Sequence, residues 1–275
     1  MMRKLIAIIA LIFVAKLSFA QTDSGYFSSF DKTKIYYEVH GNGFPVLLVH
    51  GFIVNSNSWR HTPLFDSLQA QGFKVILVDL RGNGKSDKPH NDRAYENDPE
   101  AKDIMLLLKH LHIKNYYAVG YSRGSIITAR LLALDKNLQR AVMGGMGADF
   151  TNPNWPRRIM FYHALAADTV AELHSMVQYV QKSGLDQQAL ALLQKYQPST
   201  PKEVLQKIKT PVLVIHGTED VDNGSADELA SLFPNAEKAL CPGDHNHAAA
   251  TPQFASAVIN FLKESEEQLT NIHLR

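Results

Sequence analysis

A sharp turn between an expected strand and an expected helix lies near the middle of this chain. Gly120-Tyr121-Ser122-Arg123-Gly124 has the pattern G-x-S-x-G. The apolar run 116–119 before it is typical of a buried strand, and residues 125–134 repeat apolar side chains at helical spacing. Glycine suits positions 120 and 124 because side chains in so tight a bend would clash with their neighbours. We therefore expect Ser122 to be held clear of a sheet, above the start of a helix.

Strand-like and helix-like segments alternate along most of the remaining sequence. This alternation predicts an α/β fold with a mostly parallel sheet and helices on both faces. Residues 26–40 are expected to form an early hairpin, and residues 149–201 interrupt the alternation. The further strands are expected at 46–49, 74–78, 141–144, 212–215 and 236–240, and the further helices at 57–71, 99–111 and 254–263.

Length and charge limit the classes of protein that the chain can belong to. Its 275 residues suffice for one large domain, and 45% hydrophobic residues suit a sizeable core. The formal net charge of +1 gives no strong field that would attract nucleic acid, so a nucleic-acid partner is not expected. The single cysteine, Cys241, allows no internal disulfide, and we expect it to be a buried apolar residue.

The first twenty residues have the pattern of a secretory signal peptide. Arg3 and Lys4 precede an apolar run over residues 5–14, and Ser18-Phe19-Ala20 fits a cleavage site before Gln21. The apolar stretch is short for a membrane span, although an uncleaved anchor is the alternative. The sequence thus predicts an exported protein, periplasmic or secreted, with no membrane span after cleavage of residues 1–20.

Four further segments resemble the α/β-hydrolase family, in the order in which that family has them. They are Val46-Leu47-Leu48-Val49-His50-Gly51-Phe52, Asp79-Leu80-Arg81-Gly82-Asn83-Gly84-Lys85-Ser86-Asp87, residues 210–220, and Pro242-Gly243-Asp244-His245 followed by Pro252 and Phe254. The resemblance implies an eight-stranded-type hydrolase core over residues 21–148 and 202–275. It also implies a helical cap over residues 149–201 that shapes the substrate pocket, with an extra packing layer as the alternative.

The resemblance also implies a catalytic triad. Acyl transfer by serine needs a base, a carboxylate that orients the base, and donors for the developing oxyanion. Ser122 is the expected nucleophile, Asp220 the expected acid and His245 the expected base, in the chain order of this fold. The alternatives in the neighbouring sequence are His247 for the base, and Glu219, Asp222 and Asp244 for the acid.

The backbone amides of Phe52 and Arg123 are expected to form the oxyanion hole. His50 is expected to have a structural role, and the Arg123 side chain is expected to pair with a carboxylate under the cap, or else to contact an acidic substrate. The scattered histidines predict no metal site, and no phosphate-binding or dinucleotide-binding motif predicts a cofactor.

These features predict a serine hydrolase that cleaves a carboxylic ester of a small-molecule acyl substrate through an acyl-enzyme. Thioester, amide and carbon–carbon bond cleavage are alternatives, as is cofactor-free perhydrolysis at the same site. A serine nucleophile argues against haloalkane dehalogenases and epoxide hydrolases, which have a carboxylate there. The alternative from another class is a catalytically silent hydrolase fold that binds a ligand, because fold alone does not determine function.

Overall fold

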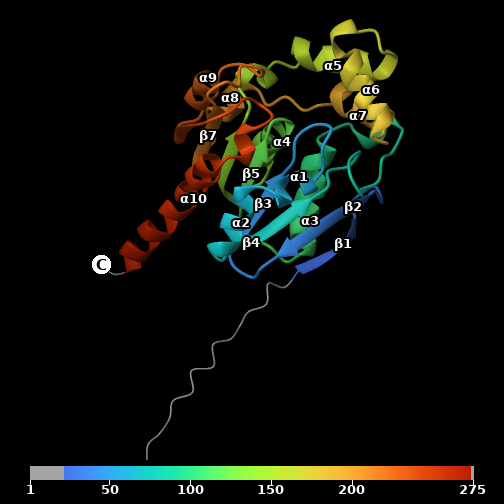
Figure 1. Cartoon of the computed structure of the whole chain (residues 1–275). Coiled ribbons are helices and arrows are strands. Elements are labelled where there is room, and N and C mark those ends of the chain that lie inside the picture. Colours follow the sequence, from blue (N-terminus) through green and yellow to red (C-terminus); the bar gives the residue numbers. More distant parts are fainter. Residues whose placement is uncertain (1–21, 274–275) are drawn as a thin grey trace, which may run out of the picture.

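Eight strands form one sheet in the part of the chain that the computed structural model describes, residues 22–273, with side chains described to residue 264. The strand order is β1-β2-β4-β3-β5-β6-β7-β8; β1 and β2 run antiparallel to their neighbours, and the rest are parallel (Figure 1). This confirms the predicted α/β fold. The strands are β1 (Thr22–Ser28), β2 (Lys34–His40), β3 (Pro45–Val49), β4 (Lys74–Val78), β5 (Tyr116–Tyr121), β6 (Leu138–Gly144), β7 (Val212–Gly217) and β8 (Ala236–Cys241).

Helices cover both faces of the sheet. Along β3, Val46 and Leu48 belong to one buried cluster, and Leu47 and Val49 belong to another, because successive side chains of a strand point to opposite faces. Helices α2 (Pro63–Ala70) and α10 (Pro252–His273) pack on the first cluster, whereas α3 (Pro99–His110), α4 (Arg123–Leu134) and α9 (Ala226–Ser231) pack on the second. Burial of each Val or Leu contributes about 1.5–3 kcal/mol, so the two clusters hold the sheet between two helical layers.

The single helix expected over residues 57–71 is wrong. The structure has α1 (Asn57–Arg60) and a separate α2, because Pro63 cannot donate the hydrogen bond that would continue α1. Thr62 caps α2 by accepting a hydrogen bond from the Phe65 amide at 3.3 Å. The break turns the chain so that Trp59 and Phe65 are both buried.

The segment between β6 and β7 carries most of the helices outside the two layers. In Figure 1, α5 (Pro156–Ala167), α6 (His174–Lys182) and α7 (Gln187–Lys195) form a group at one end of the molecule. They share a small buried cluster that includes Leu165, Val180 and Leu190, together with Tyr95 from the core. The segment also contains η2 (Ala148–Thr151), η3 (Ala171–Leu173) and α8 (Lys202–Leu205). The short helices η1 (Asp92–Ala94) and η4 (Ala248–Ala250) lie in core loops.

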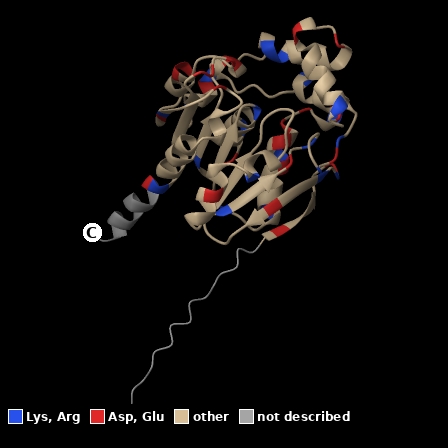
Figure 2. Cartoon of the chain, viewed as in Figure 1, with Lys and Arg blue, Asp and Glu red and all other residues tan. Residues whose placement is uncertain are grey.

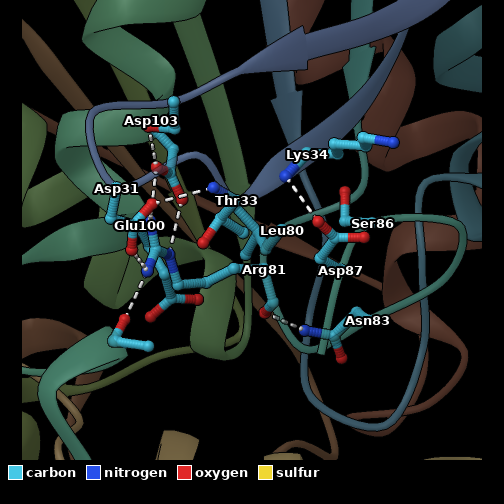
Figure 3. A network of polar contacts seen from close by, with 12 residues as sticks. Asp31, Thr33, Lys34, Leu80, Arg81, Asn83, Ser86, Asp87, Glu100 and Asp103 are labelled. Carbon is cyan, nitrogen blue, oxygen red and sulfur yellow. Dashed lines mark hydrogen bonds and ion pairs between the residues drawn. The ribbon is translucent and has the colours of Figure 1, made fainter. Parts of the chain in front are cut away.

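A buried ionic network anchors the loop that follows β4 (Figure 3). Arg81 has no exposed side-chain surface; its Nε and Nη2 donate to Asp103 of α3 at 2.7 Å each, and its Nη1 donates to Asp31 at 2.9 Å. Burial raises the pKa of the Asp103 carboxyl, and the hydrogen bonds from Arg81 oppose that rise. The network joins the β1–β2 turn, the β4 loop and α3.

Acidic and basic residues are interspersed along the ribbon in Figure 2. In the described part of the chain, no helix combines the length and the apolar character needed to cross a membrane. The expected signal peptide, residues 1–20, lies outside the described residues.

Candidate active site

Ser122 lies at the turn between β5 and α4 in a strained backbone conformation. Its φ is 54° and its ψ is −123°, a region that residues with a side chain rarely adopt. A Cβ on Gly120 would lie 2.4 Å from the carbonyl oxygen of Gly124, and one on Gly124 would lie 2.1 Å from that of Val49. Both glycines are therefore needed for the tight turn, as the sequence predicted.

Loops after β5, β7 and β8 bring Ser122, Asp220 and His245 together. The His245 Nε2 atom lies 2.9 Å from Ser122 Oγ, and its Nδ1 atom lies 2.9 Å from Asp220 Oδ2. The Asp220 side chain is fully buried, whereas the His245 side chain keeps 17% of its surface exposed. The arrangement is a continuous hydrogen-bonded chain from carboxylate through imidazole to hydroxyl.

The electrostatics favour an ionised Asp220. Burial raises the pKa of this carboxyl, but the hydrogen bond from His245, together with smaller contributions from His216 and the Asp222 amide, outweighs burial and brings the pKa below its ordinary value. With Asp220 ionised, the His245 Nδ1–H is the donor in their hydrogen bond, and Nε2 is left to accept the proton of Ser122.

Two residues that contact His245, Tyr121 and Asn223, were not predicted to do so from the sequence. Tyr121 Oη donates to the His245 carbonyl at 2.8 Å, and the two rings lie 5.5 Å apart. Asn223 is buried, and its Nδ2 lies 3.2 Å from the Gly145 carbonyl oxygen and 3.2 and 3.4 Å from the two ring nitrogens of His245. The ring atom Cε1 lies between the two nitrogens, so Asn223 Nδ2 can be close to both of them only from above or below the plane of the ring. Asn223 therefore packs against the face of the His245 ring. No motif predicts Asn223, since its contacts come from three separate loops.

The alternatives from the sequence lie apart from this chain of contacts. His247 is 77% exposed and bonds to Asp244 at 2.7 Å. Glu219 is exposed, and Asp222 faces Arg157 at 3.7 Å. The side chain in contact with Ser122 is thus that of His245, and the carboxylate bonded to His245 is that of Asp220.

The loop after β3 lies beside Ser122. A Cβ on Gly51 would lie 3.4 Å from Ser122 Cβ. His50 Nδ1 donates to the Gly51 carbonyl at 2.8 Å, while its Nε2 accepts from the Leu80 amide at 3.0 Å, and burial lowers the pKa of this histidine. Within residues 22–273, the amides of Phe52 and Arg123 donate to no protein acceptor. His50 therefore has the structural role expected of it, and both amides are free to bind an oxyanion.

The Arg123 side chain forms a buried ion pair. Its Nη1 and Nη2 atoms donate to Glu100 at 2.7 and 2.6 Å. A longer contact of 3.4 Å joins Nη2 to the Leu193 carbonyl of α7. Of the two roles considered for Arg123, the structure shows the pairing with a carboxylate, which links the start of α4 to α3 and to the α5–α7 group.

A cavity of about 460 Å³ opens at Ser122. Residues of α5 form part of its wall, and Phe161 from that helix meets Phe52 edge to face at 5.8 Å. Most of the remaining wall is apolar or aromatic, including Trp59, Ile126 and Trp155. Among the described residues, no cluster of three or more His, Cys, Asp or Glu side chains could hold a metal ion.

This combination of fold and turn is matched by known proteins. A sequence model described as the α/β hydrolase fold matches residues 45–174. The match spans a little under half of the chain, and together with the eight-stranded sheet it shows that the chain has the α/β-hydrolase fold.

Relatives and a solved structure carry names of enzymes. A putative non-heme chloroperoxidase of Synechocystis sp. is 37% identical over 40% of this chain, but the match spans only 39% of that relative. A pimeloyl-[acyl-carrier protein] methyl ester esterase of Nitrosomonas europaea is 28% identical over 76% of this chain and 90% of its own length. The crystal structure of a bromoperoxidase from Bacillus anthracis has a TM-score of 0.73 at 25% identity, covering 88% of this chain and 100% of that one. These similarities support an enzyme of the α/β-hydrolase class.

Proposed function

We propose that this protein is a serine hydrolase that cleaves a carboxylic ester through an acyl-enzyme. The observation that carries the proposal is the unbroken chain of contacts from Asp220 through His245 to Ser122, each link 2.9 Å long. A serine hydroxyl is a weak nucleophile unless a base takes its proton, and His245 Nε2 lies at the distance that this transfer needs.

The reaction follows from this geometry. His245 takes the Ser122 proton while Oγ attacks the ester carbonyl carbon, and the amides of Phe52 and Arg123 bind the negatively charged oxygen. The bond from that carbon to the alcohol oxygen then breaks, and His245 gives its proton to the departing alcohol. In the second half of the reaction, His245 takes a proton from water, and the water oxygen attacks the carbonyl carbon of the acyl-enzyme. The bond from that carbon to Ser122 Oγ then breaks, His245 returns the proton to Oγ, and the carboxylic acid is released.

Labelling with a fluorophosphonate probe tests this proposal without knowledge of the substrate. We expect the wild type to be labelled and the Ser122→Ala variant to be unlabelled, with both showing the same circular dichroism spectrum. A folded wild type that resists the probe would instead favour the catalytically silent, ligand-binding alternative.

Perhydrolysis is a second candidate reaction, favoured by the names of relatives that are called chloroperoxidase and bromoperoxidase. In this reaction hydrogen peroxide takes the place of water and attacks the same acyl-enzyme, so the products are a peroxy acid and free Ser122. The test is to add hydrogen peroxide during ester turnover and measure peroxy acid directly. Formation of peroxy acid that requires Ser122 would support it, and carboxylic acid as the sole product would exclude it.

The α5–α7 segment is proposed to be the cap over this site, within the expected cap boundaries 149–201, and the substrate is proposed to be a small acyl compound. Support comes from Trp155 and Phe161, which line the cavity from this segment.

Export is proposed from the pattern of residues 1–20. Fractionation of the producing cells, with N-terminal sequencing of the product, tests export; a chain that starts at Gln21 outside the cytoplasm is expected.

A further inference from the structure

The cavity at Ser122 has more cationic than anionic side chains in its wall. Three arginines line it, whereas Asp222 is the one carboxylate among its lining residues. Arg123 is neutralised by Glu100, with which it forms two short hydrogen bonds. The remaining positive charge belongs to Arg157 and Arg158, at the start of α5.

Arg158 has no carboxylate partner among the described residues. Its guanidinium donates to the carbonyls of Gln194 and Lys195 at 2.9 Å each and to that of Pro153 at 2.8 Å. Burial lowers the pKa of this arginine, as it does for a cation whose charge is not paired. Arg158 is thus fixed in place by backbone dipoles, and its full charge remains in the cavity wall.

Arg157 is held more loosely. It lies 5.3 Å over the Phe161 ring and 3.7 Å from Asp222, and it donates no hydrogen bond to any other described residue. About a third of its side chain is exposed. A guanidinium that rests on an aromatic ring with its N–H groups free is suited to bind a carboxylate in the bidentate geometry.

The position of these two arginines is unfavourable for the helix itself. They follow Pro156 in the first turn of α5, where the ribbon is blue in Figure 2. This turn contains no acidic residue, and Trp155 provides no side-chain cap. The positive end of a helix dipole repels cations, so the first turn concentrates positive charge that Asp222, the one carboxylate among the described residues that pairs with either arginine, offsets only in part. An anion bound in the cavity would offset it.

We infer that the substrate of this site is an ester that also carries a carboxylate group, which Arg157 binds at the start of α5 while the ester carbonyl lies at Ser122. This inference rests on the proposed ester hydrolysis. It adds that the cavity selects anionic esters, and it identifies Arg157 as the residue that determines this selection. The carboxylate can belong to the acyl part or to the alcohol part of the ester.

Matched ester pairs test the inference. Mono-4-nitrophenyl adipate and 4-nitrophenyl hexanoate have the same chain length and differ in the terminal carboxylate of the acyl part. Carboxymethyl hexanoate and ethyl hexanoate place the same difference on the alcohol part. The quantity measured is the ratio of kcat/KM for the anionic ester to that for the neutral ester, compared between wild type and variants so that intrinsic reactivity cancels.

Arg157→Gln is expected to lower this ratio about tenfold, since a charge-assisted hydrogen bond contributes enough binding energy for a factor of that size. Arg157→Lys should restore part of the ratio. Asp222→Asn, which leaves Arg157 in place and removes the competing carboxylate, should raise it. The pair of esters that responds shows which part of the substrate carries the carboxylate.

Arg93→Gln is the matched control, because Arg93 is exposed on η1 and the substitution removes the same charge. Two results would overturn the inference. In the first, the ratio of kcat/KM values is the same for wild type and Arg157→Gln. In the second, Arg157→Gln and Arg93→Gln lower that ratio by the same factor. If the neutral esters are hydrolysed only when Ser122 is present, such a result leaves the proposed function intact. If none of the four esters is hydrolysed, the proposed function fails and the inference fails with it.

Discussion

Ser122 is held in a backbone conformation that costs on the order of 1–3 kcal/mol and therefore persists only because its surroundings fix it. Its amide donates to the Gly144 carbonyl at 2.8 Å, and the two glycines of the turn leave no room for alternative packing. At this scale, the role of each residue depends on one or two contacts, so single substitutions test the site directly.

Asp220→Asn should lower kcat by a factor on the order of 10⁴, because the amide no longer fixes the tautomer of His245. Stability gives a second measurement. The pKa of Asp220 is depressed by His245, so its contribution to stability is present above its unfolded pKa of about 3.9 and is lost as pH falls through the folded pKa. The difference in free energy of unfolding between wild type and variant should therefore shrink below about pH 4. A difference that grew there would contradict the depressed pKa.

Asn223→Ala should lower kcat about fivefold, a change of about 1 kcal/mol, because it removes the amide that is held by the Gly145 carbonyl and packs against the face of the His245 ring. Asn235→Ala is the control, since Asn235 also donates from its amide to a backbone carbonyl but lies at an exposed turn. Steady-state kinetics with one chromogenic ester distinguish the two variants. A change in KM alone would mean that Asn223 contacts the substrate and does not position the base.

At the scale of elements, the loop after β4 connects the core to the site. Asp79 accepts from the Ser56 amide at 2.9 Å, and the Leu80 amide donates to His50, so this loop supports the segment that carries Phe52. The Arg81 network holds the same loop from behind. Damage to that network should therefore affect the whole fold, and the site with it.

Arg81→Met should lower the free energy of unfolding by about 3–5 kcal/mol, because it leaves Asp103 buried without its cation. Arg130→Met is the matched control: Arg130 pairs with Asp98 at 2.6 Å, but both side chains are partly exposed, so its loss should cost about 1 kcal/mol or less. Urea unfolding followed by circular dichroism measures both. Equal losses would mean that burial does not decide the strength of these pairs.

The elements that the sequence predicted correctly are those whose signal is local. The β5–Ser122–α4 turn needs glycine at two fixed positions, and the parallel strands are short apolar runs, so both are visible in the chain itself. The helix expected over residues 57–71 is wrong because the apolar pattern continues across Pro63, whereas the helical hydrogen bonds cannot. The contact of Asn223 with His245 and that of Arg157 with Asp222 each join residues that are far apart in the sequence. No local pattern in the sequence therefore predicts them.

At the scale of the whole molecule, the active site lies where the sheet meets the α5–α7 group. The core provides Ser122, Asp220 and His245 from the loops after β5, β7 and β8, and α5 provides the cationic part of the cavity wall. The proposed function and the inferred role of Arg157 therefore assign catalysis and selection of the substrate to separate parts of the chain. Substitutions in α5 are expected to change which esters react, while leaving the chain of contacts at Ser122 in place.

The stability of the whole molecule should not depend on redox conditions. Cys241 is the only cysteine in the chain and it is buried, so no internal disulfide can form, and the two hydrophobic clusters on either side of the sheet provide the stability. We expect a thiol reductant to leave the midpoint of thermal unfolding of the wild type unchanged. We expect it to leave the midpoint of the Cys241→Ala variant unchanged as well. A reductant that lowered the midpoint of the wild type alone would show that Cys241 forms a disulfide between two copies, which requires the end of β8 to open.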